Sequence, residues 1–222
     1  MGLLDNTPQA ENFEEKCLCV LALDVSGSMD GKPMFELNKG LQQFAADVAN
    51  DASLCARLEV GIVTFESHVK VVQEPALLDA FDMPKLSADG LTNMVAGIRA
   101  AMKMVRDRKD YWQAKGITYH RPWIVVITDG EPDDGQDIKS LHREIEQYKA
   151  EDAFMFLPIG IEGANMKKLA ELSEDTPKKL DGLNFAKLFV WLSNSFSKIS
   201  TAKKGEKVKF NKPDWIEEEY IV

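Results

Sequence analysis

The side chains best suited to chemistry in this chain are five oxygen donors carried by three separate loops. Two of these loops directly follow apolar runs of strand length, and the third precedes a helical pattern. Open α/β sheets place their ligand sites at the carboxyl ends of the strands, so we expect the three loops to meet there. The candidates are Asp24, Ser26, Ser28, Thr92 and Asp129.

Carboxylate and hydroxyl oxygens without His or Cys suit Mg²⁺ or Mn²⁺ better than zinc. Neutral hydroxyl ligands leave a cation short of negative charge, so it still attracts a carboxylate from outside. Gly27 and Gly130 permit tight backbone turns around an ion. A simpler interpretation is that the first loop only caps a helix with its polar side chains. The three loops taken together favour a metal-binding recognition site.

The bulk composition excludes several classes of function. The chain has 222 residues, of which 45% are hydrophobic and 28% charged, which is typical of a globular protein with a real core. The formal net charge of −9 argues against nucleic acid or anionic lipid as a partner. No apolar run approaches the roughly 20 residues that cross a bilayer. Residues 1–15 include acidic residues where a signal peptide would be basic. We expect the three cysteines to be buried, reduced thiols in a cytoplasmic protein.

Apolar runs alternate with helical patterns, which predicts a doubly wound α/β fold: a mainly parallel six-stranded sheet with helices on both faces. The 66–68 loop is short enough for a hairpin, so the strand after it should be an antiparallel edge. We expect an N-terminal extension (1–13), one domain (14–200) and a C-terminal tail (201–222). The expected strands are 17–23, 58–65, 69–73, 123–128, 153–161 and a short one near 179–180, and the expected helices are 33–48, 93–115, 138–148, 166–172 and 185–199.

Charged residues outside the five candidates allow two interpretations. Glu131, Asp133 and Asp134 either form a polar loop leading into a helix or strengthen cation binding and select the partner. The basic side chains of the 93–115 helix are expected to form its solvated face. They are Arg99, Lys103, Arg106, Arg108 and Lys109.

The C-terminal tail also has two interpretations. Lysines come first after residue 200, then Pro213, Trp215 and an acidic run. The tail either folds back loosely in solvent or docks on a partner. Docking would use Phe210, Trp215 and Tyr220 as anchors, because aromatic side chains are favoured at interface centres.

The five candidate residues resemble the metal-ion-dependent adhesion site (MIDAS) of von Willebrand factor A domains. The family pattern is Asp-x-Ser-x-Ser, then a Thr, then an Asp, and residues 14–200 are covered by the resemblance. More narrowly, the stretches 127–134 and 185–193 resemble bacterial TerY-type proteins of the tellurium-resistance group. The resemblance implies a sheet of five parallel strands and one antiparallel edge strand, in agreement with the pattern analysis.

The resemblance further implies a non-enzymatic adaptor whose Mg²⁺, or Mn²⁺, is completed by an Asp or Glu of a protein partner. In TerY-like systems such partners include kinase-like and PP2C-like phosphatase proteins. One alternative is a Mg²⁺-dependent phosphohydrolase with Asp24 as nucleophile, but Ser26 stands where that chemistry needs a second carboxylate. Another is an RNA-binding A-domain protein, which the acidic balance disfavours.

Overall fold

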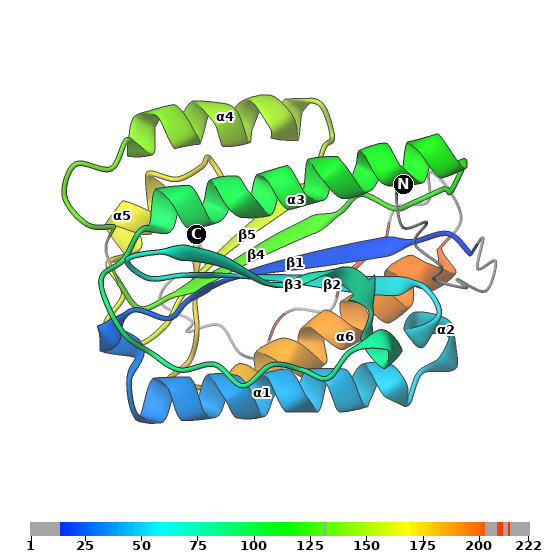
Figure 1. The fold of residues 1–222 in the computed structure, drawn as a ribbon, viewed down its shortest axis with the longest axis horizontal. Helices are drawn as coiled ribbons and strands as arrows, with labels where there is room; N and C mark the ends of the chain where they lie inside the picture. Colours follow the sequence, from blue (N-terminus) through cyan, green and yellow to red (C-terminus); the bar gives the residue numbers. More distant parts are fainter. Residues whose placement is uncertain (1–13, 131, 203–207, 211–212, 214–222) are drawn as a thin grey trace, which may run out of the picture.

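The computed structural model describes residues 14–130, 132–202, 208–210 and 213. Within them, six strands form one sheet, flanked by helices (Figure 1). The strands are β1 (Cys17–Asp24), β2 (Leu58–Phe65), β3 (Val69–Leu77), β4 (Trp123–Thr128), β5 (Met155–Gly160) and β6 (Lys178–Lys179). The helices are α1 (Lys32–Ala49), α2 (Ala52–Cys55), α3 (Met94–Lys115), α4 (Ile138–Ala150), α5 (Met166–Ala170) and α6 (Phe185–Thr201), with 3₁₀ turns η1 (Gly27–Met29) and η2 (Leu78–Ala80).

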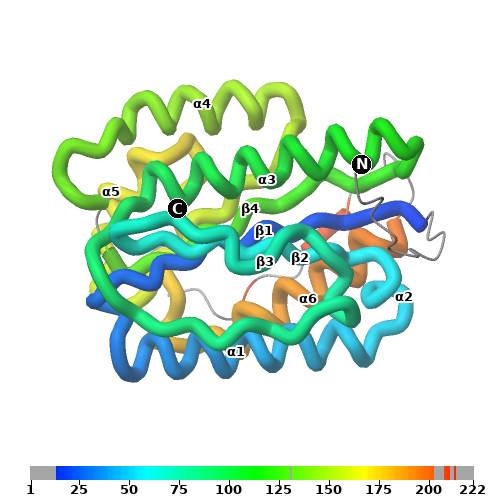
Figure 2. The backbone as a smooth tube through the Cα atoms, viewed as in Figure 1, coloured from blue at the N-terminus to red at the C-terminus, as the bar shows by residue number. Residues whose placement is uncertain are grey.

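The sheet has the strand order β3-β2-β1-β4-β5-β6. Neighbouring strands run parallel except at β2–β3, where the pairing is antiparallel. Helices α1, α2 and α6 cover one face, whereas α3, α4 and α5 cover the other (Figures 1 and 2). The expected fold, a doubly wound and mainly parallel sheet with one antiparallel edge strand, is therefore confirmed.

Strand β1 lies in the middle of the sheet, so both of its faces are buried. Cys17, Cys19 and Leu21 belong to the core beneath α1 and α6, whereas Leu18 and Val20 belong to the core beneath α3 and α4. Alternate residues of a strand point to opposite faces, which explains why this segment is apolar at every position.

Close helix packing depends on two glycines. A β-carbon built on Gly40 of α1 would lie 2.8 Å from a ring carbon of Phe189 in α6. One built on Gly97 of α3 would lie 2.5 Å from a ring carbon of Phe65 in β2. Any larger residue would push these elements apart, since packed interiors leave no spare volume.

The structure corrects two details of the sequence analysis. Strand β3 continues past residue 73 to Leu77, which pairs with Glu59, because irregularities in the β2–β3 register let the pairing resume after a break. The prediction that Arg108 lies on a solvated face was wrong. Its guanidinium reaches inward to the carboxylate of Glu59, a residue only 3% exposed.

The described part of the C-terminal tail packs against the domain. The Phe210 ring stands edge-on to Trp123 with centroids 5.3 Å apart and lies 6.3 Å from the Trp191 ring. Phe210 is nevertheless 38% exposed. The other two predicted anchors, Trp215 and Tyr220, lie outside the described residues.

The three cysteines are unpaired. Cys17 and Cys19 are buried, and burial raises the pKa of the Cys17 thiol to about 12, so it stays protonated and unreactive. Cys55 is only partly buried, which differs from the expectation of three buried thiols. Among the residues that the structure describes, none of the helices is long and apolar enough to cross a membrane.

Candidate functional site

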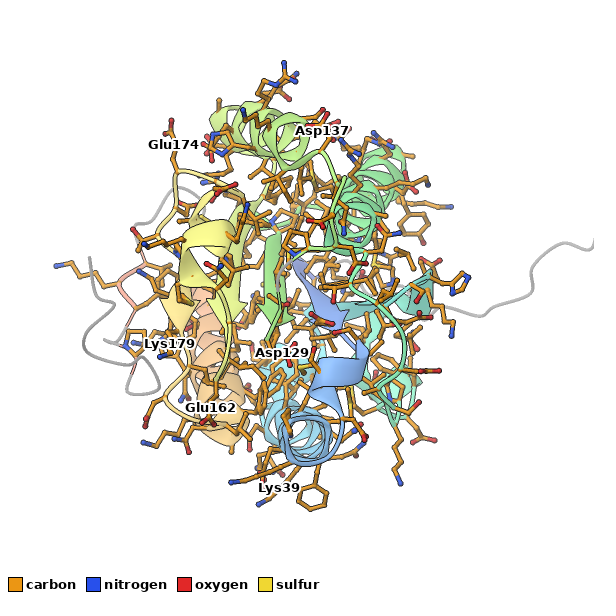
Figure 3. The ribbon with its side chains drawn as sticks, turned by 90° about the vertical axis from the view of Figure 1, so that its left-hand side faces the viewer. Lys39, Asp129, Asp137, Glu162, Glu174 and Lys179 are labelled. Carbon is orange, nitrogen blue, oxygen red and sulfur yellow. The ribbon has the colours of Figure 1, made fainter. Side chains whose placement is uncertain are left out.

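The candidate residues meet at the carboxyl end of the sheet. Strands β1 and β4 are neighbours and parallel, with Leu23 opposite Ile127, so the loops that follow them emerge side by side. Figure 3 views this end of the molecule, with Asp129 near its centre. The Thr92 loop joins them because the Gly27 amide donates a 3.0 Å hydrogen bond to the Gly90 carbonyl.

Asp24 forms the buried floor of the site and is fully shielded from solvent. Its Oδ1 accepts a 2.8 Å hydrogen bond from the Ser26 amide, and its Oδ2 accepts a 2.5 Å bond from the Thr128 hydroxyl. Burial raises the pKa of this carboxyl to about 6, although the hydrogen bonds from Ser26 and Thr128 oppose the shift. A cation bound nearby would stabilise the charged form of this buried carboxylate.

A chain of hydroxyls crosses from the first loop to the third. Ser26 Oγ lies 3.1 Å from Ser28 Oγ, and Ser28 Oγ donates a 2.9 Å hydrogen bond to Asp129 Oδ1. Adjacent ligand oxygens of an octahedral Mg²⁺ with bonds of 2.0–2.1 Å stand roughly 2.9 Å apart. Both of these oxygen–oxygen distances are therefore compatible with neighbouring ligands of one small cation.

Thr92 reaches the same place from the second loop. A β-carbon built on Gly130 would lie 3.6 Å from both Thr92 Oγ1 and Asp24 Oδ2, so these two oxygens face the same short backbone segment. Thr92 is 7% exposed and Ser26 only 2%. The structure thus brings together all five residues predicted from the sequence.

The site opens to solvent on one side. Ser28 is exposed and Asp129 partly exposed, whereas the other three candidates are buried. Partial burial also raises the pKa of Asp129, although the hydrogen bond from Ser28 opposes the shift. Across residues 14–130, 132–202, 208–210 and 213, no group of three or more His, Cys, Asp and Glu side chains could hold a metal ion. The oxygen set with its three hydroxyls fits a hard divalent cation held with an open position.

Sequence reasoning missed two residues that support the site. Thr128 was assigned only as the end of a strand, yet its hydroxyl bonds the Asp24 carboxylate. Gln136 uses both polar atoms of its side-chain amide, since Nε2 donates to the Thr92 carbonyl and Oε1 accepts from the Val95 amide in α3. A polar residue at the end of an otherwise apolar strand was the available signal for Thr128, whereas Gln136 had none.

The four predicted partner-binding residues have different positions. Asp133 accepts a hydrogen bond from the Thr92 amide at 2.9 Å, so one of its carboxylate oxygens already has a partner within the protein. Asp134 is exposed on the loop that leads to α4. Glu131 and Trp215 lie outside the described residues.

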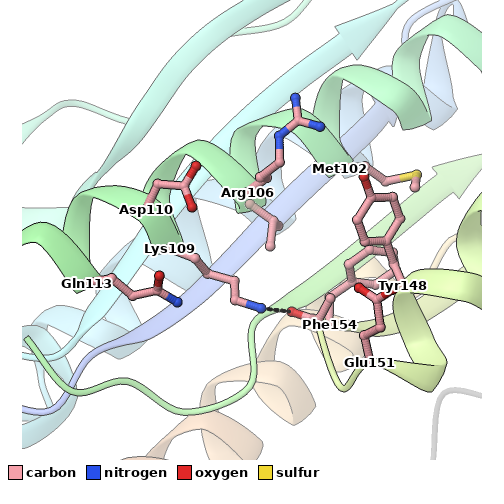
Figure 4. Close-up of a pocket in the computed structure, with 10 residues that line it drawn as sticks. Met102, Arg106, Lys109, Asp110, Gln113, Tyr148, Glu151 and Phe154 are labelled. Atoms are coloured by element: carbon pink, nitrogen blue, oxygen red, sulfur yellow. Dashed lines mark hydrogen bonds between the residues drawn. The ribbon is translucent and has the colours of Figure 1, made fainter.

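A separate hollow lies away from this site. It has a volume of about 170 Å³ between the second half of α3 and the turn from α4 to β5 (Figure 4). Tyr148 and Phe154 form an aromatic wall with ring centroids 6.1 Å apart, and the Lys109 ammonium donates a 3.3 Å hydrogen bond to the Ala153 carbonyl. Charges of both signs line it, so its chemistry does not single out one class of ligand.

The comparisons with known proteins agree with the fold. Residues 19–187 match the family described as the von Willebrand factor type A domain, and the chain belongs to this family. As a member of this family, the chain belongs to the general functional class of interaction modules. No match was found among curated protein sequences.

Solved structures show the same fold at low sequence identity. The pilus adhesin SpaC from Lactobacillus rhamnosus GG superimposes with a TM-score of 0.63 at 14% identity, covering 84% of this chain and 30% of that one. The ArnB paralog VWA2 from Sulfolobus acidocaldarius gives 0.53 at 13% identity, covering 82% and 45%. Proximal thread matrix protein 1 from the mussel byssus, with a zinc-occupied MIDAS motif, gives 0.52 at 19% identity, covering 82% and 48%. The chain thus spans 30–48% of the length of these proteins.

Proposed function

We propose that this chain is a non-enzymatic adaptor that binds a protein partner through a divalent metal ion, Mg²⁺ or Mn²⁺. The ion is held by Asp24, Ser26, Ser28, Thr92 and Asp129, and an Asp or Glu of the partner completes its coordination. The observation that carries the proposal is the oxygen chain from Ser26 through Ser28 to Asp129, which has the spacing of neighbouring metal ligands.

The distribution of charge and exposure supports a partner carboxylate. Three of the five proposed ligands are neutral hydroxyls, so the two carboxylates add no excess of negative charge around a divalent ion that would repel a partner carboxylate. The open side at Ser28 and Asp129 leaves room for a further ligand. The zinc-occupied MIDAS motif of the mussel byssus protein, which has a similar fold, supports a divalent ion as well.

The geometry around Asp24 does not favour the phosphohydrolase alternative. A nucleophilic carboxylate must reach the phosphoryl group, but Asp24 is fully buried and both of its oxygens accept hydrogen bonds from the chain itself. Ser26 is also not an acid or base of suitable pKa. Asp24 is instead well placed to balance the charge of an ion above it.

A few further residues are proposed to contact the partner. Glu131, Asp134 and Trp215 keep this assignment, and Leu91 joins them because it is 64% exposed directly beside Thr92. An exposed leucine at the edge of a polar site offers apolar contact area to whatever supplies the carboxylate.

The cellular setting is proposed from the sequence resemblance. We place the protein in the cytoplasm, within a bacterial tellurium or stress-resistance system of the TerY type, with kinase-like or PP2C-like phosphatase proteins as partners. The unpaired cysteines in β1 support a reducing compartment.

Metal binding is tested directly by titrating the protein with Mn²⁺ and following free Mn²⁺ by electron paramagnetic resonance, with Mg²⁺ as competitor. Binding by the wild type should disappear in Asp24→Ala and in the double variant Ser26→Ala/Ser28→Ala. Ser53→Ala, at the exposed start of α2, is the matched control. A wild type that binds neither ion would refute the proposal.

Partner binding is then tested by affinity capture from native bacterial lysate with excess Mg²⁺ in one arm and EDTA in the other. A protein retained only with Mg²⁺, and lost with Thr92→Ala bait, is the expected result. Identical capture in both arms would mean that the metal does not bridge to the partner, and Trp215→Ala bait would then test the tail.

A further inference from the structure

The backbone around Thr92 is held by the segment that follows Asp129. Residues 81–93 form no helix or strand, so local structure alone does not fix the Thr92 loop. The Thr92 amide donates to Asp133 Oδ2 at 2.9 Å, and the Thr92 carbonyl accepts from the Asp133 amide at 3.2 Å. Asp133 therefore forms hydrogen bonds with both the N–H and the C=O group of Thr92.

Gln136 holds the same backbone through hydrogen bonds to Thr92 and Val95. Its Nε2 donates to the Thr92 carbonyl at 2.6 Å, and its Oε1 accepts from the Val95 amide at 2.8 Å. Asn93, the residue before α3, forms no side-chain capping bond within the described part of the chain. The amide of Gln136 thus takes the place of the missing cap and satisfies a free N–H group in the first turn of the helix.

We propose that Asp133 and Gln136 are positioning residues of the metal site, which together form a clamp on the Thr92 backbone. The proposal rests on the proposed function, since it concerns how the same ion is held. Asp133 follows Asp129 by four residues, so the clamp joins a ligand of the second loop to a ligand of the third. Asp133 then acts within the protein instead of contacting the partner.

The clamp should matter most for a small ion. Mg²⁺ demands near-ideal octahedral geometry at 2.0–2.1 Å, whereas Ca²⁺ accepts flexible geometry at 2.3–2.6 Å. If the Thr92 hydroxyl is no longer held in place, the affinity for Mg²⁺ should fall more than the affinity for Ca²⁺. Loss of the clamp should therefore lower the preference for Mg²⁺ over Ca²⁺ as well as the affinity for Mg²⁺.

Four variants separate the hydrogen bonds from the charge. Asp133→Ala and Gln136→Ala each remove the hydrogen bonds that one side chain forms with this backbone. Asp133→Asn keeps an oxygen that can accept from the Thr92 amide but removes the charge. Gln136→Glu keeps an acceptor for Val95 but has no donor for the Thr92 carbonyl. The charge control is Glu162→Gln, an exposed residue on the same end of the molecule (Figure 3).

The first measurement is the affinity for Mg²⁺ and for Ca²⁺ by competition against Mn²⁺. Asp133→Ala, Gln136→Ala and Gln136→Glu should lower Mg²⁺ affinity about 10–100-fold, as expected when a group that orients a ligand is removed, and Ca²⁺ affinity less. Asp133→Asn should stay near wild type because its side-chain oxygen still accepts from the Thr92 amide, and Glu162→Gln should do so because exposed charges are screened. Mg²⁺ affinity unchanged in both alanine variants, or an equal loss for Mg²⁺ and Ca²⁺, would overturn the clamp and leave the metal site standing. A wild type without metal binding would overturn both proposals.

The second measurement needs no metal. In EDTA, hydrogen exchange of the segment from Thr92 to Val95 should accelerate in Asp133→Ala and Gln136→Ala and stay slow in Asp133→Asn and Glu162→Gln. Exchange in β1 should be the same in all variants, which shows that the fold is intact. Unchanged exchange at Thr92 in the alanine variants would contradict the clamp even if their metal affinity fell.

Discussion

Replacement of Arg108 by methionine should strongly destabilise the protein. Arg108 Nε and Nη2 donate to the two carboxylate oxygens of Glu59 at 2.5 and 2.7 Å, and the guanidinium carbon lies 4.5 Å from the Tyr111 ring centroid. Methionine fills much of the same volume but leaves the Glu59 carboxylate, 3% exposed, without its ionic partner. The change therefore isolates the cost of an unpaired charge.

Breaking a buried ion pair by removing one partner costs about 3–5 kcal/mol. The Lys16 ammonium still acts electrostatically on Glu59, so we expect the lower end, about 3 kcal/mol in the free energy of unfolding. The double variant Glu59→Leu/Arg108→Met removes both charges. It should lose clearly less than Arg108→Met alone, because apolar side chains of similar volume replace a buried ion pair at little cost, although Lys16 then loses the favourable charge of Glu59.

Urea unfolding followed by circular dichroism measures these differences. The matched control is Arg106→Met on the same helix, whose exposed side chain lies 3.9 Å from Asp107 and should change stability by less than about 0.5 kcal/mol. A loss below about 1 kcal/mol in Arg108→Met would refute the reasoning. A double variant whose loss of unfolding free energy equals the losses of Arg108→Met and Glu59→Leu added together would also refute it.

Three further effects are expected. Gly97→Ala should cost about 1–3 kcal/mol of unfolding free energy, because the added methyl meets Phe65; an unchanged denaturation midpoint would contradict this packing. Hydrogen bonds from Ser197 and the Leu54 amide lower the pKa of Asp51, so its contribution is present above the ordinary pKa of roughly 3.9 and lost as pH falls through the lowered value. Asp51→Ala should therefore cost about 1 kcal/mol at pH 7 and much less at pH 2, by thermal unfolding at both. Excess Mg²⁺ should raise the melting temperature of the wild type but not of Asp129→Ala, and equal shifts would indicate nonspecific stabilisation.

The fold and the meeting of the candidate site residues at one end of the sheet were largely predictable because their signals are local. The apolar run of β1 followed by Asp24, Ser26 and Ser28 marks a strand and the polar loop at its end, and the same holds for β4 and Asp129. Thr92 was selected from a loop that precedes a helical pattern, and it also fits the family pattern, although its own loop has no regular structure. The extent of β3 was underestimated because a break in pairing register leaves no clear mark in a sequence.

The roles of polar side chains that bond across the fold could not be predicted. Arg108 has the helical spacing of its solvated neighbours, and only the position of β2 beneath α3 gives it a buried carboxylate to pair with. Thr128 and Gln136 acquire their roles from neighbours that are distant in sequence, Asp24 and Thr92. The sequence by itself determined which segments are apolar strands and which oxygen donors follow them, because periodicity and turn chemistry act over a few residues. Only the tertiary structure decided which donors are held rigidly, because hydrogen bonds between loops depend on how the sheet brings their ends together.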